Sequence, residues 1–393
     1  MSADIPARRA ARGERLPLSI KARQIPIKIE PVVGLADVVT DEQLIKALNA
    51  SRPLWHPPTV PSLIHELKLW GRNANFTKQM VGQARSGTTM VETLLSDKLC
   101  RERTTPNGAS FLVDSPFGIN VVQSGTMDAK YNRAEGHYGQ LLMVLGETGV
   151  PLNTPVTTAS GRCGTIADIL QEAVMRFEWS KELEFIGVAL ALWLPPETSW
   201  TDQFGNRYSF DELVEHLMAV PCGQGACGGC HIAYTIAVVL QVDSQYRILS
   251  SSNRQRAVQR LANISARLEK TKLVEGGWDQ TWPGGGTKGI IYEDSLLDQI
   301  TVIGHHLEWI SLVQEPARPS RETVAHAVSA CIADIDRLPP LDHRSFKTIL
   351  PCSHAAHALC LLRNKDPFTT WMAYWAAKNS EVIKNTEKVS AEP

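Results

Sequence analysis

The feature that most constrains the fold of this chain is a set of short apolar segments that recur along it. Each opens with small residues beside a histidine or an acid and carries almost no charge after its first turn; the five are 136–146, 181–194, 228–241, 304–313 and 352–362. A helix that is apolar on most faces must be surrounded by other helices rather than by water. We therefore predict that these segments form interior helices.

Amphipathic helices are predicted between the apolar ones. Thr40 and Gln43 form a capping-box pair at the start of one, and residues 253–272 place apolar side chains at helical spacing. Gly205 and Asn206 lie between short polar and aromatic runs, which predicts a β-hairpin inserted near residues 200–208. The alternation of all-apolar and one-faced helices predicts an all-α fold with two concentric layers.

The spacing of the apolar segments is close to periodic. His137 lies 47 residues before Glu184, Glu184 lies 47 before His231, and His305 lies 49 before His354. A period that holds two helices and two loops is typical of helical-hairpin repeats. A further step of the same length back from His137 reaches Met90, which we take as a sixth interior segment. Six hairpins that close on themselves predict an α/α toroid over residues 39–378.

The ends of the chain differ from this central region. Residues 1–38 begin with clustered arginines that no apolar run follows, and are predicted to be a flexible basic arm rather than an export signal. Residues 379–393 are predicted to be a polar tail. With 40 basic and 41 acidic side chains and eight cysteines, we expect a soluble cytoplasmic protein with reduced thiols that binds neither nucleic acid nor membranes. The oligomeric state is not predicted.

One stretch resembles a known repeat. Residues 268–282 are similar to the motif that ends an outer helix in squalene-cyclase and prenyltransferase toroids, with Gly276 and Trp278 matching and Lys272 in the place of a glutamine. The resemblance implies the toroid fold. No acid-rich protonation motif or diphosphate-binding aspartate cluster accompanies it, so no specific enzyme family is matched.

In such a toroid the interior helices would begin at one opening, so residues of their first turns would meet there although they are far apart in sequence. We predict a histidine-lined site in which five side chains carry acid–base chemistry: His137, His231, His305, His354 and Glu184. Six others are predicted to bind a substrate: His306, Trp309, Tyr234, Trp193, Asp279 and Trp282. The aromatic members of this set are equally compatible with core packing.

The run Pro221–Leu240 also contains residue types that bind metal ions. Its four soft donors, Cys222, Cys227, Cys230 and His231, form an alternative zinc site, which resembles the Cys-His pair of the toroidal lanthionine synthetases. Neighbouring residues on a helix point about 100° apart, which makes Cys230 and His231 poor joint ligands. The spacing Cys-Gly-Gly-Cys-His also matches a c-type haem attachment signal, but that chemistry needs export, so no haem is expected. Our preferred interpretation is that the cysteines pack in the interior and no cofactor is bound.

These observations favour an enzyme that performs acid–base chemistry on a carbohydrate-like or isoprenoid-like small molecule, of the epimerase, lyase or cyclase type. Two alternatives stay open. One is a zinc-dependent toroid that uses Cys230 and His231 in thiol or prenyl chemistry. The other is a non-catalytic binding or scaffold protein with the same fold.

Overall fold

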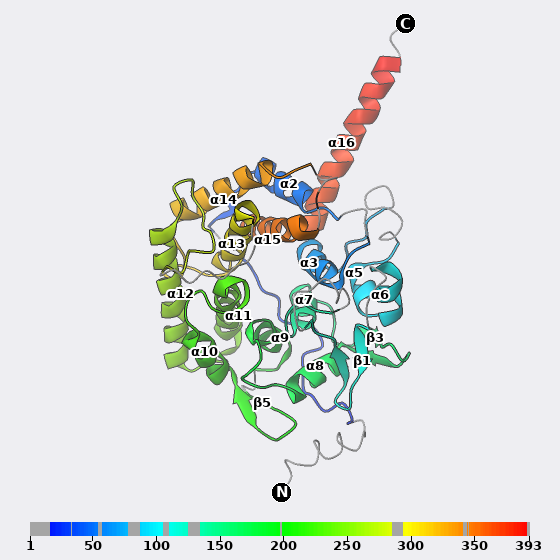
Figure 1. Ribbon diagram of the computed structural model, residues 1–393, viewed down its shortest axis with the longest axis vertical. Coiled ribbons are helices and arrows are strands. Elements are labelled where there is room, and N and C mark those ends of the chain that lie inside the picture. The colour runs from blue at the N-terminus through cyan, green and yellow to red at the C-terminus, as the bar shows by residue number, and fades with distance from the viewer. Residues whose placement is uncertain are drawn as a thin grey trace.

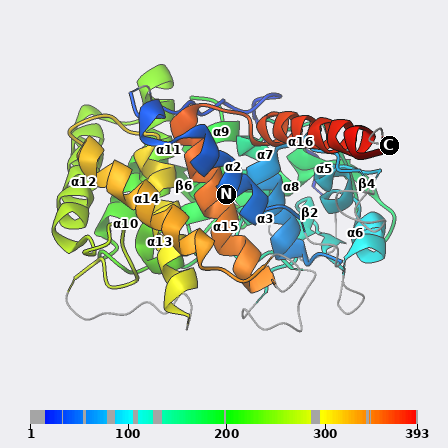
Figure 2. The ribbon, with the colours of Figure 1, turned by 90° about the horizontal axis from the view of Figure 1, so that it is seen from above.

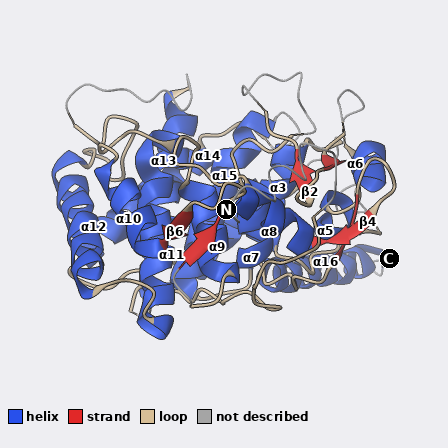
Figure 3. Ribbon diagram, turned by 90° about the horizontal axis from the view of Figure 1, so that it is seen from below, coloured by secondary structure: helices blue, strands red, loops and turns tan. Residues whose placement is uncertain are grey.

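The computed structural model describes residues 16–32, 34–53, 57–77, 87–104, 110–124, 134–196, 199–284, 294–340, 344 and 346–390. The described residues are mostly helical, with 14 helices over 55% of them and a few short strands, which confirms the predicted all-α class (Figure 3).

Six helices contact one another in a closed cycle. In cyclic order they are α3 (Val60–Trp70), α7 (Gln140–Glu147), α9 (Glu184–Trp193), α11 (Cys230–Tyr246), α13 (Ser295–Ile310) and α15 (Phe346–Arg363), and α15 packs on α3. They lie around the middle of the molecule in Figure 1. Every residue of α9 is buried, as expected for a helix enclosed by others.

Most of the other helices pack outside this cycle. They are α2 (Asp41–Ala50), α5 (Met90–Leu94), α6 (Asp97–Arg103), α8 (Ile166–Met175), α10 (Phe210–Ala219), α12 (Ser251–Thr271), α14 (Arg321–Asp336) and α16 (Pro367–Ser390). The helices α2 and α14 lie on α15 (Figure 2), and α12 packs on α11. The predicted capping box of Thr40 and Gln43 is present at the start of α2. The expected alternation of interior and outer helices is therefore found through most of the chain.

Within the described parts of the chain, the strands form three antiparallel hairpins. These pair β1 (Leu112–Asp114) with β2 (Ile119–Val121), β3 (Pro155–Thr157) with β4 (Cys163–Thr165), and β5 (Ser199–Thr201) with β6 (Arg207–Ser209). The last is the hairpin predicted near residues 200–208. Its turn is fixed by Asp202, which accepts hydrogen bonds from the backbone N–H groups of Phe204 and Asn206.

The predicted sixth interior segment was wrong. Met90 begins the five-residue helix α5, which packs on α3 and α6. The interior position belongs to α3, which lies between α7 and α15 in the cycle. Sequence spacing failed here because the connection from α3 to α7 is much longer than a single repeat.

The predicted extent of the flexible N-terminal arm also needs correction. Residues 1–15 lie outside the described residues. The part of the expected arm from residue 16 onward packs on the helices, with Leu16, Ile27 and Leu35 buried. At the other end, α16 continues to Ser390 where a polar tail was predicted, and Figure 1 shows it extending away from the other helices.

Within the described residues, one helical segment is long and apolar enough to cross a membrane by length and composition, Ala226–Tyr246. Most of it is buried by the neighbouring helices, which is also what a core helix of a folded domain shows.

Candidate metal centre

Four histidines from four interior helices meet in the centre of the cycle. His65 lies on α3, His231 on α11, His305 on α13 and His354 on α15. The ring centroids of His305 and His354 are 3.8 Å apart, those of His231 and His305 are 4.5 Å apart, and those of His65 and His354 are 5.1 Å apart. We call these four residues the imidazole layer. The structure thus brings together three of the histidines singled out in the sequence and adds His65.

Cys227 reaches this layer from a glycine-rich turn before α11. The turn is a short 3₁₀ segment, Ala226–Gly229, in which Cys227 adopts φ 49° and ψ 47°. This left-handed conformation is unfavourable for a residue with a side chain and is found most often where function or packing requires it. Glu184 holds the turn in place, because its Oε1 accepts a hydrogen bond from the Ala226 N–H at 3.0 Å. Glu184 therefore supports the position of Cys227, and its predicted catalytic role stays a prediction.

Cys227, His231 and His305 form a set of donors suited to a metal ion. The thiol sulfur of Cys227 and one ring nitrogen from each histidine lie within 4.8 Å of one another. In tetrahedral zinc sites, neighbouring ligand atoms are roughly 3.3–3.6 Å apart, given the usual Zn–N and Zn–S bond lengths. Small side-chain rotations would close that difference. The Nε2 atom of His305 is buried and has no hydrogen-bond partner among the described residues, which leaves it available as a ligand.

The electrostatics of the centre suit ligands that must be deprotonated. Burial and the nearby His305 charge lower the pKa of His231 well below its usual value, so its imidazole is neutral. Burial is the largest effect on the pKa of Cys227 and raises it, but the interactions with His305 and His137 together lower that pKa overall. For His305, burial lowers the pKa, and the Cys227 and Glu308 charges raise it to about 9. Cys227 and His305 thus stabilise each other's charged forms, and a metal ion would replace the imidazolium proton as the partner of the thiolate.

A second set of polar side chains lies one helical turn beyond the imidazole layer. Each follows a histidine of that layer by three residues on the same helix; the four are Lys68, Tyr234, Glu308 and His357. Residues three apart share one face of a helix. We call this set the charge layer. Glu308 is its centre, with Lys68 Nζ at 3.4 Å and His357 Nδ1 at 2.7 Å from Oε1.

Glu308 also bonds to two members of the imidazole layer. The Nδ1 atom of His305 lies 3.4 Å from Oε2, and the Nδ1 atom of His354 lies 3.3 Å from both carboxylate oxygens. His305, Glu308 and His354 also offer ligand atoms within 4.8 Å of one another. The buried Lys68 ammonium, however, lies 3.4 Å from Oε1 of Glu308 and would repel a cation bound there. We therefore place the candidate ion on the Cys227 side of His305.

His137 lies at the more exposed edge of the site. Its ring stacks on Phe185 at 4.4 Å and its centroid is 6.3 Å from that of His231. Its Nδ1 atom lies 2.9 Å from both carboxylate oxygens of Glu182. Burial lowers the pKa of His137, but Glu182 outweighs it and the net shift is upward. The partner of His137 is thus Glu182 rather than Glu184.

The other cysteines of the predicted zinc quartet do not share this centre. Cys230 faces a different side of α11, where its sulfur lies 3.6 Å from Nε2 of His306. Cys222 belongs to neither group of donor atoms found among the described residues. Because Cys230 and His231 are neighbours on a helix, only one of them can face the interior histidines. All eight cysteines fall within the described residues, and no disulfide bond joins them.

His306 and the predicted aromatic contacts are packed in the core. His306 is fully buried; Trp309 Nε1 donates to its Nδ1 at 2.9 Å, and Trp282 packs on its ring edge-on at 4.6 Å. Burial lowers the pKa of His306 to about 3, so it is a neutral structural group. Trp193 is fully buried as well.

The two remaining predicted contacts lie away from the imidazole layer. Asp279 accepts hydrogen bonds from the N–H and hydroxyl groups of Thr281 and thereby stabilises a turn. Tyr234 belongs to the charge layer and donates to Glu147 Oε1 at 2.5 Å.

Sequence reasoning missed His65, Lys68 and Glu308. His65 and Lys68 lie on α3, a helix with no glycine at its start, so it did not match the pattern of the other interior helices. A signal for both Lys68 and Glu308 was present in the sequence, because each lies three residues after a histidine in an interior helix. A search for polar residues at that spacing would have found the charge layer.

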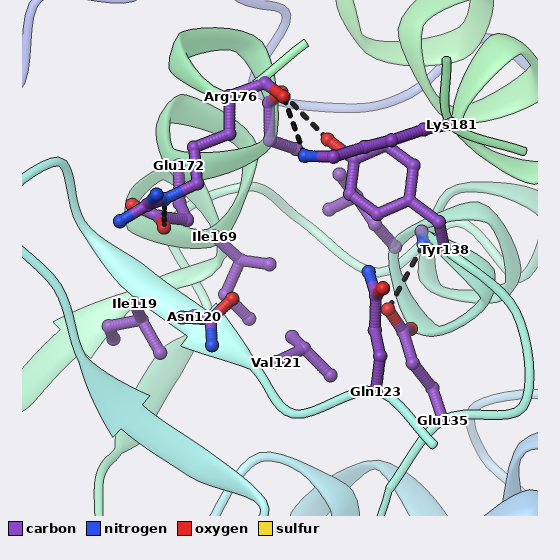
Figure 4. Close-up of a pocket in the computed structure, with 13 residues that line it drawn as sticks. Ile119, Asn120, Val121, Gln123, Glu135, Tyr138, Ile169, Glu172, Arg176 and Lys181 are labelled. Atoms are coloured by element: carbon purple, nitrogen blue, oxygen red, sulfur yellow. Dashed lines mark hydrogen bonds and ion pairs between the residues drawn. The ribbon is translucent and has the colours of Figure 1, made fainter. Parts of the chain in front are cut away.

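The cavities show how little room the centre offers. A cavity of about 10 Å³ lies between His65, Lys68, Gln140, Phe185, His231 and His354, which is about the space of one water molecule. A larger cavity of about 200 Å³ lies elsewhere, between β2, α8 and the start of α7 (Figure 4). Glu172 pairs with Arg176 at 2.5 Å, and Lys181 donates to the Arg176 carbonyl oxygen at 2.7 Å. Glu135 accepts hydrogen bonds from the backbone N–H groups of Gly139 and Leu141. This cavity contains none of the residues predicted to be functional.

We compared the chain with protein-family models, curated proteins and solved structures, and none of them matches it.

Proposed function

We propose that the closed cycle of six helices and its outer helices form an α/α toroid. The order of helix contacts supports this, since each interior helix touches the next and the last touches the first. The packing of Trp278 also supports it: Gly276 and Gly277 adopt positive φ, and the Trp278 indole N–H donates to Leu268 on α12 at 2.9 Å.

We further propose that the protein is a zinc-dependent enzyme acting on a small molecule, with Cys227, His231 and His305 as the ligands. The observation that carries this proposal is the convergence of three such donor atoms within 4.8 Å, two from the stretch that leads into α11 and one from the distant helix α13. Zinc held by three protein ligands keeps a fourth position for water or a substrate atom and makes either one more nucleophilic. This revises the zinc alternative predicted from sequence by replacing Cys230 with Cys227 and adding His305.

His137 and Glu182 supply the acid–base function in this proposal. They are the exposed members of the site, with 24% and 30% of their side chains accessible. With Nδ1 paired to Glu182, His137 keeps Nε2 to exchange a proton with a reactant. A carbohydrate-like or isoprenoid-like substrate and a cytoplasmic location stay part of the proposal.

Metal analysis tests the proposal. The purified protein is loaded with Zn²⁺, dialysed, and analysed for metal content and for affinity by competition with a chromogenic chelator. Wild type is expected to keep one Zn²⁺ per chain, and Cys227→Ser to bind more than about 100-fold more weakly. Cys230→Ser is the matched control, since it removes a thiol three residues away that faces His306; it should bind like wild type. Wild type without bound zinc would overturn the proposal.

A metal-free acid–base enzyme is the second candidate. It is favoured by the His137–Glu182 pair, whose geometry needs no metal. Absence of zinc from wild type, together with intact folding, would favour this reading or the scaffold alternative over the zinc enzyme.

A further inference from the structure

We propose that Glu308 is the positioning residue of the metal centre, fixing the ring of His305 so that Nε2 faces Cys227 and His231. The inference rests on the proposed zinc site and names the residue that determines its affinity. Glu308 is 1% exposed and lies one turn beyond His305 on α13.

The first step is the hydrogen bond between the two residues. An ionised carboxylate can only accept, so a contact between Oε2 of Glu308 and Nδ1 of His305 requires the proton to be on Nδ1. In the neutral ring this leaves the lone pair on Nε2, the buried atom without a partner among the described residues. Histidine ligands of metals commonly carry such a carboxylate partner, which sets the tautomer and raises the basicity of the ligand nitrogen.

The second step is the charge of Glu308. A buried carboxylate is stable only when it is paired. The Lys68 ammonium at 3.4 Å and the two further imidazoles of His354 and His357 provide that pairing. They also hold the carboxylate from several directions, so its position is fixed before any ion binds.

The third step is the comparison with Glu147. Its carboxylate is also largely buried; it lies 3.9 Å from Lys68 Nζ and accepts from the Tyr234 hydroxyl. Among the described residues, Glu147 makes no hydrogen bond or ion pair with a histidine. Glu147 therefore shares the lysine partner of Glu308 without its imidazole contacts, which makes it a matched control.

The experiment measures Zn²⁺ affinity by chelator competition for wild type, Glu308→Gln and Glu147→Gln, with melting curves of the metal-free proteins alongside. We expect Glu308→Gln to bind zinc about 10–100-fold more weakly than wild type. Glu147→Gln should stay within about twofold, because it leaves His305 untouched. A purely structural role for Glu308 would lower the melting temperature without changing zinc affinity.

A double variant is the control in case Glu308→Gln alone does not fold. Glu308→Gln with Lys68→Met removes the charge of Glu308 together with that of its lysine partner, while Glu147, which shares Lys68, keeps its hydrogen bond from the Tyr234 hydroxyl. The zinc affinity of the double variant should fall by the same 10–100-fold. If Glu308→Gln or the double variant binds zinc as tightly as wild type, the positioning role is wrong, whereas a wild type that binds no zinc removes the metal site itself.

Discussion

At the scale of single residues, the centre of the molecule contains several buried titratable groups, which packing alone does not require. Lys68 and Glu308 are both buried, and their mutual attraction opposes the cost of burial. Burial lowers the pKa of Lys68, but Glu147 and Glu308 raise it overall. Burial raises the pKa of Glu308, but Lys68 and His354 hold it well below its usual range. Both groups therefore stay charged inside the fold.

The His137–Glu182 pair gives a pH-dependent prediction. A histidine whose pKa is raised on folding adds stability that is fully present below its unfolded value of 6.5 and is lost as pH rises through the folded value. Glu182→Gln should therefore lower the free energy of unfolding at pH 6, by less than about 1 kcal/mol because both groups are partly exposed. The effect should vanish near pH 9. Urea unfolding at the two pH values measures it.

Glu215→Gln is the control for this experiment. Glu215 pairs with Arg256 at 2.9 Å on the surface, in an ion pair that contains no histidine. The effect of Glu215→Gln on the free energy of unfolding should be the same at pH 6 and at pH 9. An effect of Glu182→Gln that grows toward pH 9 would contradict the ion pair with His137.

Much of the site was predictable from residues, and the misses have physical causes. The spacing of His231, His305 and His354 predicted that each lies in the first turn of an interior helix. The structure brings the three rings together, but only His231 lies in a first turn, because α13 and α15 begin well before His305 and His354. Which cysteine joins them depends on the left-handed backbone at Cys227, and residue type and spacing do not encode that turn. A motif alone therefore could not distinguish Cys227 from Cys230.

At the scale of elements, the contact between α13 and α15 is the most extensive in the cycle. A Cβ atom on Gly304 would lie 2.7 Å from the backbone nitrogen of Ala355 and 3.1 Å from the Cβ of His354. Only glycine lets the two helix backbones approach this closely. The short distance between the rings of His305 and His354 is a consequence of that approach.

Gly304→Ala tests this packing. Alanine is favoured over glycine within a helix by about 1 kcal/mol, but the clash with the backbone of α15 should cost more, about 1–3 kcal/mol net. We therefore expect a lower free energy of unfolding by chemical denaturation. Gly187→Ala on α9 is the control, since its Cβ would meet only side-chain methyl groups at 3.1 and 3.3 Å, and its effect should stay within about 1 kcal/mol. Equal effects at the two sites would contradict the argument.

Element boundaries were predicted best where local chemistry sets them. The capping box at Thr40 and the hairpin turn between β5 and β6 depend on neighbouring residues only. The place of α3 in the cycle depends instead on contacts with α7 and α15, which lie far from it in sequence. Local patterns could not supply that information.

At the scale of the whole molecule, residues 16–32 cross the ends of several interior helices. The backbone N–H groups of Arg23 and Ile27 donate to Trp193 and Leu192 at the end of α9, and the N–H of Val32 donates to Ser311 after α13. These bonds satisfy carbonyl groups that a helix end leaves without partners. The start of α9, by contrast, holds the Cys227 turn through Glu184. The N-terminal segment therefore lies at the opposite end of α9 from Cys227, about 15 Å away.

The contribution of this segment to stability is measurable. Ile27 is 6% exposed and Ile25 is 61% exposed, although both lie on the same extended stretch. Ile27→Ala should lower the free energy of unfolding by about 2–4 kcal/mol, and Ile25→Ala by less than about 0.5 kcal/mol. Thermal and urea unfolding compare the two. Similar values would mean that the segment adds little to the fold.

The N-terminal crossing has a consequence for the proposed enzyme. Residues 16–32 cover the ends of α9 and α13, and Lys68 and Glu308 are buried between the interior helices. In the proposed enzyme, a substrate would therefore approach the Cys227 sulfur from the other end of α9, where His137 and Glu182 are partly exposed.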